Sequence, residues 1–243
     1  GVSGLNSTLT SISGFSTAIS VSSSGGDVAD QGTCAVLSDG TVKCLGNIML
    51  GDGLTSGSLT PVTVTGISNA TLVSTGNNHV CSSLADGTVK CWGRGSYGQL
   101  GDGSASSQTT PILVNGISSA KAVSAGYDFT CALLLDGTIK CWGSGAWGGL
   151  GNGSDNNRKS TPVSVIGVNT AISISTGYAH ACAVLSDGTI KCWGYNIYGQ
   201  LGNGTSIESY EPVSVNGVST AISVSTSSTN MSHTCAVLSG GGV

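Results

Sequence analysis

The chain has 243 residues, of which 8% are charged, 5% are aromatic and 39 are glycine, and its formal net charge is −4. Only eight residues are Lys or Arg, and four of these occupy one repeated position, so the chain lacks the basic cluster that neutralises phosphates and nucleic acid is a poor partner. Low charge combined with abundant Gly, Ser, Thr and Val disfavours long helices and predicts an all-β chain of short strands and tight turns.

The sequence begins at Gly1 without a signal peptide, and no apolar run approaches the ~20 residues that cross a bilayer. We therefore expect no membrane span, and a chain that was processed or cut from something longer. The Ser/Thr/Gly-rich segments 22–33 and 226–234 are longer than their counterparts elsewhere in the chain, and we interpret them as variable loops at the two ends.

A motif of the form Cys-Ala-Val-Leu-x-Asp-Gly-Thr recurs along the chain. Self-similarity at a fixed period is typical of repeat architectures such as propellers and solenoids. We predict a single repeat domain, 1–243, whose last unit is incomplete. The first cysteines of the five copies are Cys34, Cys81, Cys131, Cys182 and Cys235, and the approximate units are 1–66, 67–116, 117–167, 168–217 and 218–243.

In the first four copies a second cysteine follows ten residues after the first, with Asp-Gly between them. Asp-Gly between alternating apolar residues is a strong hairpin signal. If Ser186, Asp187 and Gly188 form a three-residue loop, the register places Cys182 opposite Cys192, close enough for a disulfide. The same count predicts four disulfides: Cys34–Cys44, Cys81–Cys91, Cys131–Cys141 and Cys182–Cys192.

The cysteine spacing matches neither zinc-ribbon nor redox Cys-x-x-Cys motifs, whereas paired cysteines in a β chain of low charge fit an oxidising compartment. We therefore expect an extracellular or cell-surface location. Cys235 has no counterpart ten residues later within the sequence, so it is either unpaired or bonded between chains.

Two further strands are expected in each unit. Trp-Gly and a glycine-rich loop follow the hairpin in three copies, beginning at Trp92, Trp142 and Trp193. A strand then follows a proline, as at Pro162-Val163, and another alternates through residues 171–174. Four short strands in ~50 residues is the arithmetic of a propeller blade.

Residues 177–202, Gly-Tyr-Ala-His-Ala-Cys-Ala-Val-Leu-Ser-Asp-Gly-Thr-Ile-Lys-Cys-Trp-Gly-Tyr-Asn-Ile-Tyr-Gly-Gln-Leu-Gly, resemble the regulator-of-chromosome-condensation repeat in its cysteine-bearing extracellular form. The resemblance covers nearly the whole chain and implies a toroidal propeller, usually of seven blades. Its members include a nuclear guanine-nucleotide exchange factor and a secreted β-lactamase inhibitor protein, so the resemblance transfers fold rather than function. Here we expect about five four-stranded blades in a closed ring or an open arc, with a degenerate first unit that has Leu45 in place of tryptophan.

The sequence provides no catalytic or metal constellation. His79, His180 and His233 each stand two residues before a first cysteine, so a metal or catalytic site would require distant repeats to converge, and a recurring structural role is the better interpretation. The loop residues that invite a calcium hypothesis are single oxygen donors in separate repeats, too few for six to eight ligands. They are Asp52, Asp102, Asn152 and Asn203. No Gly-x-Ser-x-Gly elbow is present, and we predict neither enzymatic activity nor a cofactor.

Aromatic residues in loops are the candidate binding face, because Tyr and Trp are enriched in interface hot spots. The candidates are Tyr97, Trp147, Tyr198, Tyr127 and Tyr178. The alternative, packing between blades, is the favoured interpretation for the first three. Five Asn-x-Ser/Thr sequons are glycosylation candidates if the host glycosylates secreted proteins. They are Asn6, Asn69, Asn152, Asn203 and Asn230.

These observations favour a non-catalytic extracellular or cell-surface scaffold that binds protein or builds surface structure. A nucleotide-exchange or chromatin-binding role is disfavoured by the cysteine pairs and the missing basic surface. A secreted enzyme inhibitor would need a concentrated aromatic patch, and a subunit of an extracellular filament or sheath would use unpaired strand edges. Because fewer than seven repeats are present, we expect either a fragment of a longer propeller or a protomer that joins copies of itself in a homopolymer.

Overall fold

The computed structural model describes residues 12–24, 31–154, 157–228 and 233–242. Within these ranges the regular structure consists of eighteen β-strands and one 3₁₀ turn, η1 (Ala146–Gly148). The prediction of an all-β chain is confirmed. No helix among the described residues has the length and apolar character needed to cross a bilayer.

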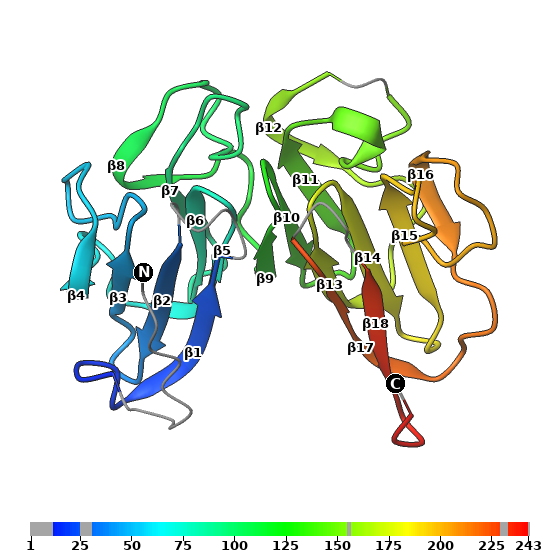
Figure 1. Cartoon of the computed structure of the whole chain (residues 1–243), viewed down its shortest axis with the longest axis horizontal. Helices are drawn as coiled ribbons and strands as arrows, with labels where there is room; N and C mark the ends of the chain where they lie inside the picture. The colour runs from blue at the N-terminus through cyan, green and yellow to red at the C-terminus, as the bar shows by residue number, and fades with distance from the viewer. Residues whose placement is uncertain (1–11, 25–30, 155–156, 229–232, 243) are drawn as a thin grey trace, which may run out of the picture.

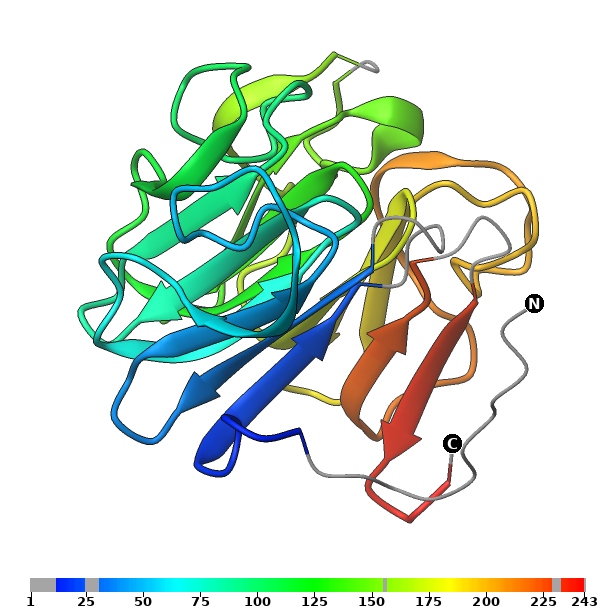
Figure 2. The same cartoon turned by 60° about the vertical axis from the view of Figure 1, so that its left-hand side comes forward.

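The strands form five antiparallel sheets, here called blades 1 to 5, which succeed one another along the chain (Figures 1 and 2). Blade 1 contains β1 (Ala18–Ser23), β2 (Gly32–Leu37), β3 (Val42–Gly46) and β4 (Ser58–Thr63). Blade 2 contains β5 (Ala70–Thr75), β6 (His79–Leu84), β7 (Val89–Gly93) and β8 (Gln108–Leu113). Blade 3 contains β9 (Ala120–Ala125), β10 (Phe129–Leu134), β11 (Ile139–Gly143) and β12 (Lys159–Ser164). Blade 4 contains β13 (Ala171–Thr176), β14 (His180–Leu185), β15 (Ile190–Gly194) and β16 (Ser209–Ser214), and blade 5 contains β17 (Ala221–Thr226) and β18 (Thr234–Leu238).

The Asp-Gly turns set the register of the central hairpin in each of the first four blades. In blade 4 the backbone N–H of Thr189 donates to Asp187 Oδ1 at 2.9 Å, and Leu185 N–H donates to the Thr189 carbonyl at 2.9 Å. This turn pairs Cys182 with Cys192 across the two strands. The structure contains the disulfides Cys34–Cys44, Cys81–Cys91, Cys131–Cys141 and Cys182–Cys192, and the remaining cysteine, Cys235, is a free and exposed thiol.

Blades 2, 3 and 4 bury both faces of their second strands against neighbouring blades. The second strands β6, β10 and β14 are buried at every position, because adjacent blades cover the two sides of the sheet. Their near-continuous apolar runs are typical of strands that are covered on both faces. The largest fully buried side chains are three tryptophans of the third strands, Trp92, Trp142 and Trp193.

Short hydroxyl side chains join the first strands of successive blades. Ser124 Oγ lies 2.8 Å from Thr176 Oγ1 and also accepts the backbone N–H of Thr176 at 3.0 Å. The same pair of bonds recurs between Ser22 and Thr75 and between Ser175 and Thr226. The Ser and Thr residues that alternate with apolar residues in these strands therefore hold the blades together along their inner edges.

The two segments interpreted as variable end loops fall partly outside the described residues, which exclude 25–30 and 229–232.

Candidate binding face

The strand order brings distant loops to one end of the blades. In an antiparallel meander, the connection between the first and second strands and the connection between the third and fourth strands leave the sheet at the same end. Tyr127 and Tyr178 lie in first-to-second connections, whereas Trp147, Tyr195 and Tyr198 lie in third-to-fourth connections. This end of the molecule is at the top of Figure 1, where the β7–β8 and β11–β12 connections lie.

Five aromatic side chains form a continuous series at this end, here called the aromatic row. The ring centroids of Tyr127 and Tyr178 are 4.7 Å apart, and those of Trp147 and Tyr178 are 6.5 Å apart. Tyr195 lies 5.1 Å from Trp147 and 6.3 Å from Tyr198. These separations are those of favourable aromatic pairs. The row therefore runs from blade 3 into blade 4 as one surface. Four of its five residues had been predicted from the sequence as candidates for a binding face.

A cavity of about 310 Å³ opens beside this row. Tyr97, Tyr127, Asp128, Trp147 and Tyr178 contribute to its wall. A volume of this size is at the lower end of those that accept small molecules or a single inserted side chain. The cavity lies between blades 2, 3 and 4, so it exists only because the blades are packed together.

Among the described residues, the wall of the cavity contains one titratable carboxyl group, that of Asp128. Burial raises the pKa of its carboxyl group, and the positive charge of Arg94 acts in the opposite direction. Its Oδ1 atom accepts a long hydrogen bond, 3.5 Å, from Gln99 Nε2. Arg94 also lies over the ring of Tyr97, with its Cζ atom 5.3 Å from the centroid. Aromatic faces together with a carboxylate are the surroundings that a cation prefers.

Trp147 adopts a backbone conformation that is unusual for a bulky residue, with φ at 53° and ψ at 23°. Among the described residues it is the sole non-glycine residue with positive φ. Such conformations cost free energy and persist where the surrounding structure enforces them, which is common at ligand-binding sites. In this conformation the indole lies next to Tyr178 and Tyr195.

The exposed fractions separate two classes of aromatic residue. Tyr97 and Trp147 are each 39% exposed and Tyr198 is 61% exposed, and Trp147 of blade 3 also contacts Tyr178 and Tyr195 of blade 4. The tryptophans that follow the second cysteines are, by contrast, fully buried between blades. The loop aromatics are therefore available at the surface.

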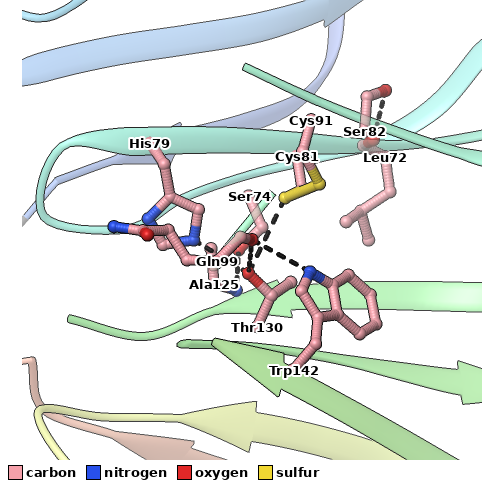
Figure 3. The surroundings of a disulfide bond; sticks show 10 residues. All are labelled: Leu72, Ser74, His79, Cys81, Ser82, Cys91, Gln99, Ala125, Thr130 and Trp142. Carbon is pink, nitrogen blue, oxygen red and sulfur yellow. Dashed lines mark hydrogen bonds between the residues drawn. A yellow bond between two sulfur atoms is a disulfide. The ribbon is translucent and has the colours of Figure 1, made fainter. Parts of the chain in front are cut away.

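His79 and His180 belong to the blade interfaces, whereas His233 is exposed. His79 Nε2 lies 2.9 Å from Thr130 Oγ1, and Thr130 donates to the Gln99 carbonyl at 3.0 Å, so His79 is protonated on Nε2 (Figure 3). Trp142 Nε1 donates to the same carbonyl at 2.9 Å. Burial lowers the pKa of His79 from 6.5 to about 3. No group of three or more metal-ligating side chains occurs among the described residues.

The equivalent contact joins blades 4 and 5. His180 Nε2 lies 3.0 Å from Thr234 Oγ1, and Thr234 donates to the Gln200 carbonyl at 2.9 Å. Burial, with a smaller contribution from the charge of His233, lowers the pKa of His180 from 6.5 to about 4.

The sequons have different surroundings. Asn69 is exposed, whereas the side chains of Asn152 and Asn203 are half-buried and accept hydrogen bonds from Ser154 and Thr205 within their own turns. Asn6 and Asn230 lie outside the described residues. Glycosylation at the five sites stays a prediction.

Comparison with known families identifies the repeat. A family model described as the regulator of chromosome condensation (RCC1) repeat matches residues 86–133, 136–184 and 187–237. The chain belongs to this family. A second model with the same description matches residues 70–99 and 171–200. Each match to the first model begins at the Asp of a hairpin turn, so one sequence repeat spans parts of two blades.

Solved structures of RCC1 repeat proteins share the fold. Human WBSCR16 superposes with a TM-score of 0.76 at 22% identity, over 85% of this chain and 55% of the human chain. Yeast RCC1 (Prp20) in its complex with Kap60 gives a TM-score of 0.74 at 22% identity, over 87% of this chain and 53% of the yeast chain. Prp20p from Saccharomyces cerevisiae, reported with its binding properties to Gsp1p and histones, gives 0.74 at 22% identity over 86% and 54%. No curated protein matches the sequence.

The chain therefore spans about half the length of these propellers, and at this identity the likeness concerns fold alone. The predicted propeller of RCC1-type blades is confirmed.

Proposed function

We propose that this RCC1-repeat chain is a non-catalytic extracellular or cell-surface scaffold that binds a protein partner through the aromatic row and the adjoining cavity. The observation that carries the proposal is the continuous contact of Tyr127, Trp147, Tyr178, Tyr195 and Tyr198 at one end of the blades. Tyr and Trp supply large, rigid contact areas at low entropic cost and dominate interface hot spots.

The cavity chemistry favours a cationic anchor on the partner. Tyr127, Trp147 and Tyr178 contribute aromatic side chains to the wall, and Asp128 contributes a carboxyl group. A Lys or Arg side chain from a partner would gain cation–π contacts and a charge-assisted hydrogen bond there. The raised pKa of Asp128 has burial as its main cause, and a bound cation would offset that cost by stabilising the ionised carboxylate.

Two further observations support this reading. The four disulfides indicate a non-reducing environment, which favours a secreted or surface location. The yeast relative has been solved in complex with the protein Kap60, so a propeller of this type is compatible with protein binding.

Selection of peptide ligands from a random phage-displayed library provides an unbiased test. We expect the selected peptides to share a Lys or Arg next to an apolar residue and to lose about tenfold or more in affinity when Trp147 or Tyr178 is replaced by Ala. The matched control is Leu135→Ala, because Leu135 is 73% exposed and lies at the hairpin end of blade 3, away from the row.

Ligands that bind the Trp147→Ala protein as tightly as the unaltered protein would contradict the proposal. So would ligands whose binding depends on Leu135. Replacement of Asp128 by Asn tests the anchor separately, since it preserves shape while removing charge and should weaken cationic peptides only.

A structural subunit of a filament or sheath is the second candidate. It is favoured by strand β1, whose residues Ile19 and Val21 are 63% and 60% exposed on its outward face. Apolar residues on a terminal strand invite association with another copy. Light scattering across a concentration series distinguishes the candidates: a mass that grows with concentration supports the filament, and a constant mass supports the scaffold. A secreted inhibitor would use the same aromatic row as the scaffold and differ only in the partner being an enzyme.

A further inference from the structure

Three blade interfaces share one arrangement, in which a tryptophan inserts into a glycine loop of the preceding blade. Trp142 packs in a cluster with Leu100, Val114 and Ile117 of blade 2. A Cβ atom on Gly101 would lie 2.8 Å from the indole Nε1 atom. The same distance is found from Gly51 to Trp92 and from Gly151 to Trp193. In each case only glycine leaves room for the indole.

Blade 4 presents the same wall toward blade 5, but a cavity of about 540 Å³ takes the place of the indole. Its lining includes Leu201, Gly202, Val215 and Val218, the counterparts of the residues that enclose Trp193 one blade earlier. A Cβ atom on Gly202 would approach the Val215 side chain at 3.0 Å and no tryptophan. Glycine thus recurs at a fourth equivalent position, although no indole of the described residues lies beside it there.

The polar partner of an indole is also in place. In the interface of blades 2 and 3, the Gln99 carbonyl accepts from Thr130 Oγ1 and from Trp142 Nε1, as Figure 3 shows. In the interface of blades 4 and 5, the Gln200 carbonyl accepts from Thr234 Oγ1 at 2.9 Å. The matching geometry would bring an indole N–H in this cavity within reach of the Gln200 carbonyl.

Strand β18 has the features of a second strand that awaits a third. Among the described strands it pairs with β17 alone, and its residues alternate between half-buried and exposed. It ends in the same turn as the complete hairpins, with Leu238 N–H donating to the Gly242 carbonyl at 2.8 Å. In the shared register, the residue opposite Cys235 is a cysteine and the next residue is a tryptophan.

We propose that this cavity and the outer edge of β18 form a docking site for a β-strand of the Lys-Cys-Trp-Gly type, supplied by a polypeptide segment other than the described strands. The strand pairs with β18, its tryptophan enters the cavity beside Gly202, and its cysteine bonds to Cys235. The four described strands of this general type already pair within their own hairpins, so a second folded copy does not offer one. This inference concerns a different site from the aromatic row, and Tyr198 is the one member of the row that also lines this cavity.

The covalent step is a thiol–disulfide exchange. The Cys235 thiolate attacks the sulfur of an incoming cysteine that is held as a mixed disulfide with a small thiol, and the small thiol leaves as its thiolate. One S–S bond forms and one breaks, and no separate oxidant is consumed. The exposure of Cys235 makes the attack sterically possible.

The test uses the 243-residue protein and a synthetic peptide that copies residues 189–194, Thr-Ile-Lys-Cys-Trp-Gly, with its cysteine activated by 5-thio-2-nitrobenzoate. Release of the coloured thiol gives the rate, and mass spectrometry gives the adduct. We expect this peptide to react on the order of tenfold or more faster than a peptide with alanine in place of tryptophan, because indole burial precedes exchange. Equal rates for the two peptides, on the unaltered protein, would overturn the proposal.

Two protein variants locate the effect. Val215→Trp fills the cavity and should remove the preference for the tryptophan peptide, whereas Ile207→Trp, at a position 71% exposed, should retain it. Cys235→Ser should abolish the adduct but keep a ¹⁹F chemical-shift change from a peptide carrying 5-fluorotryptophan. Trp147→Ala should leave the rate of thiol–disulfide exchange unchanged, so the test of this docking site and the test of the proposed function can fail independently of each other. If Cys235–Cys235 dimers form in preference to the adduct, the occupant is a second copy and the proposal is wrong.

Discussion

Thr130 accepts a hydrogen bond from His79 across the interface of blades 2 and 3, and it does so because its own proton is given to the Gln99 carbonyl. The contact has a counterpart between His180 and Thr234. The interface of blades 3 and 4 has Phe129 and Ala181 at the two equivalent positions. Histidine and threonine therefore occur together, and phenylalanine occurs with alanine.

Stability should fall in mild acid. The pKa of His79 is lowered from 6.5 to about 3 and that of His180 to about 4, so between about pH 6.5 and these values the unfolded chain binds protons that the folded chain does not. The free energy of unfolding should therefore be constant above about pH 6.5 and decline below it. Urea titrations at about pH 7.5 and pH 4.5 measure the decline. It should be smaller in a variant that lacks His79, and an undiminished slope would contradict the assignment.

The His79–Thr130 pair can be replaced by the Phe–Ala pair that occurs between blades 3 and 4. Thr130→Ala alone should lower the free energy of unfolding by about 1–3 kcal/mol, because it removes the partner of a buried imidazole. His79→Phe combined with Thr130→Ala reproduces the pair found between blades 3 and 4 and should recover part of that loss. A double-mutant cycle from urea denaturation gives the coupling energy. Strictly additive effects would show that the two side chains do not interact.

The disulfides should stabilise the blades individually. Replacing both Cys131 and Cys141 by Ser should lower the free energy of unfolding by about 2–3 kcal/mol in the chain-entropy model for a ten-residue separation. Non-reducing peptide mapping should recover the four hairpin pairs. Free thiols at these positions, or bridges between blades, would refute the pairing.

A pair of glycines separates backbone strain from crowding. Gly188 has φ at 80° and an added Cβ atom would lie 2.5 Å from the Ser219 carbonyl oxygen, whereas Gly217 has φ at 75° and open space around it. Gly217→Ala should cost about 1 kcal/mol for the left-handed conformation, and Gly188→Ala should cost clearly more. Thermal denaturation of the two variants gives the comparison, and equal losses would show that the blade contact is unimportant.

The local sequence pattern was sufficient to predict the fold because each hairpin contains the turn residues that set its own register. Asp187 and Gly188 fix the turn, and the alternation that follows fixes the face of every side chain. The aromatic row was harder to predict. Tyr195 was not among the candidates because its repeat equivalents are Arg94 and Ser144, so no periodic signal marks it. Its recognition depends on two connections meeting at one end of neighbouring blades, which is a property of the packed array.

The exposure of the loop aromatic residues also could not be predicted from the sequence. Trp147 and Trp142 are five residues apart in one repeat, yet the first is 39% exposed and the second is fully buried. Trp142 lies in the interface with blade 2, where Gly101 leaves room for its ring, whereas Trp147 lies in the β11–β12 connection beside Tyr178 and Tyr195.

The pairing of His with Thr and of Phe with Ala has a consequence for how such an array can change its number of blades. Deleting blade 3 would bring the His79 side of blade 2 against the Ala181 side of blade 4, leaving a buried imidazole without its hydroxyl. Deleting blades 3 and 4 together would instead bring His79 to Thr234, a matched pair. Over this stretch we therefore expect the array to tolerate the gain or loss of two adjacent blades more readily than that of a single blade.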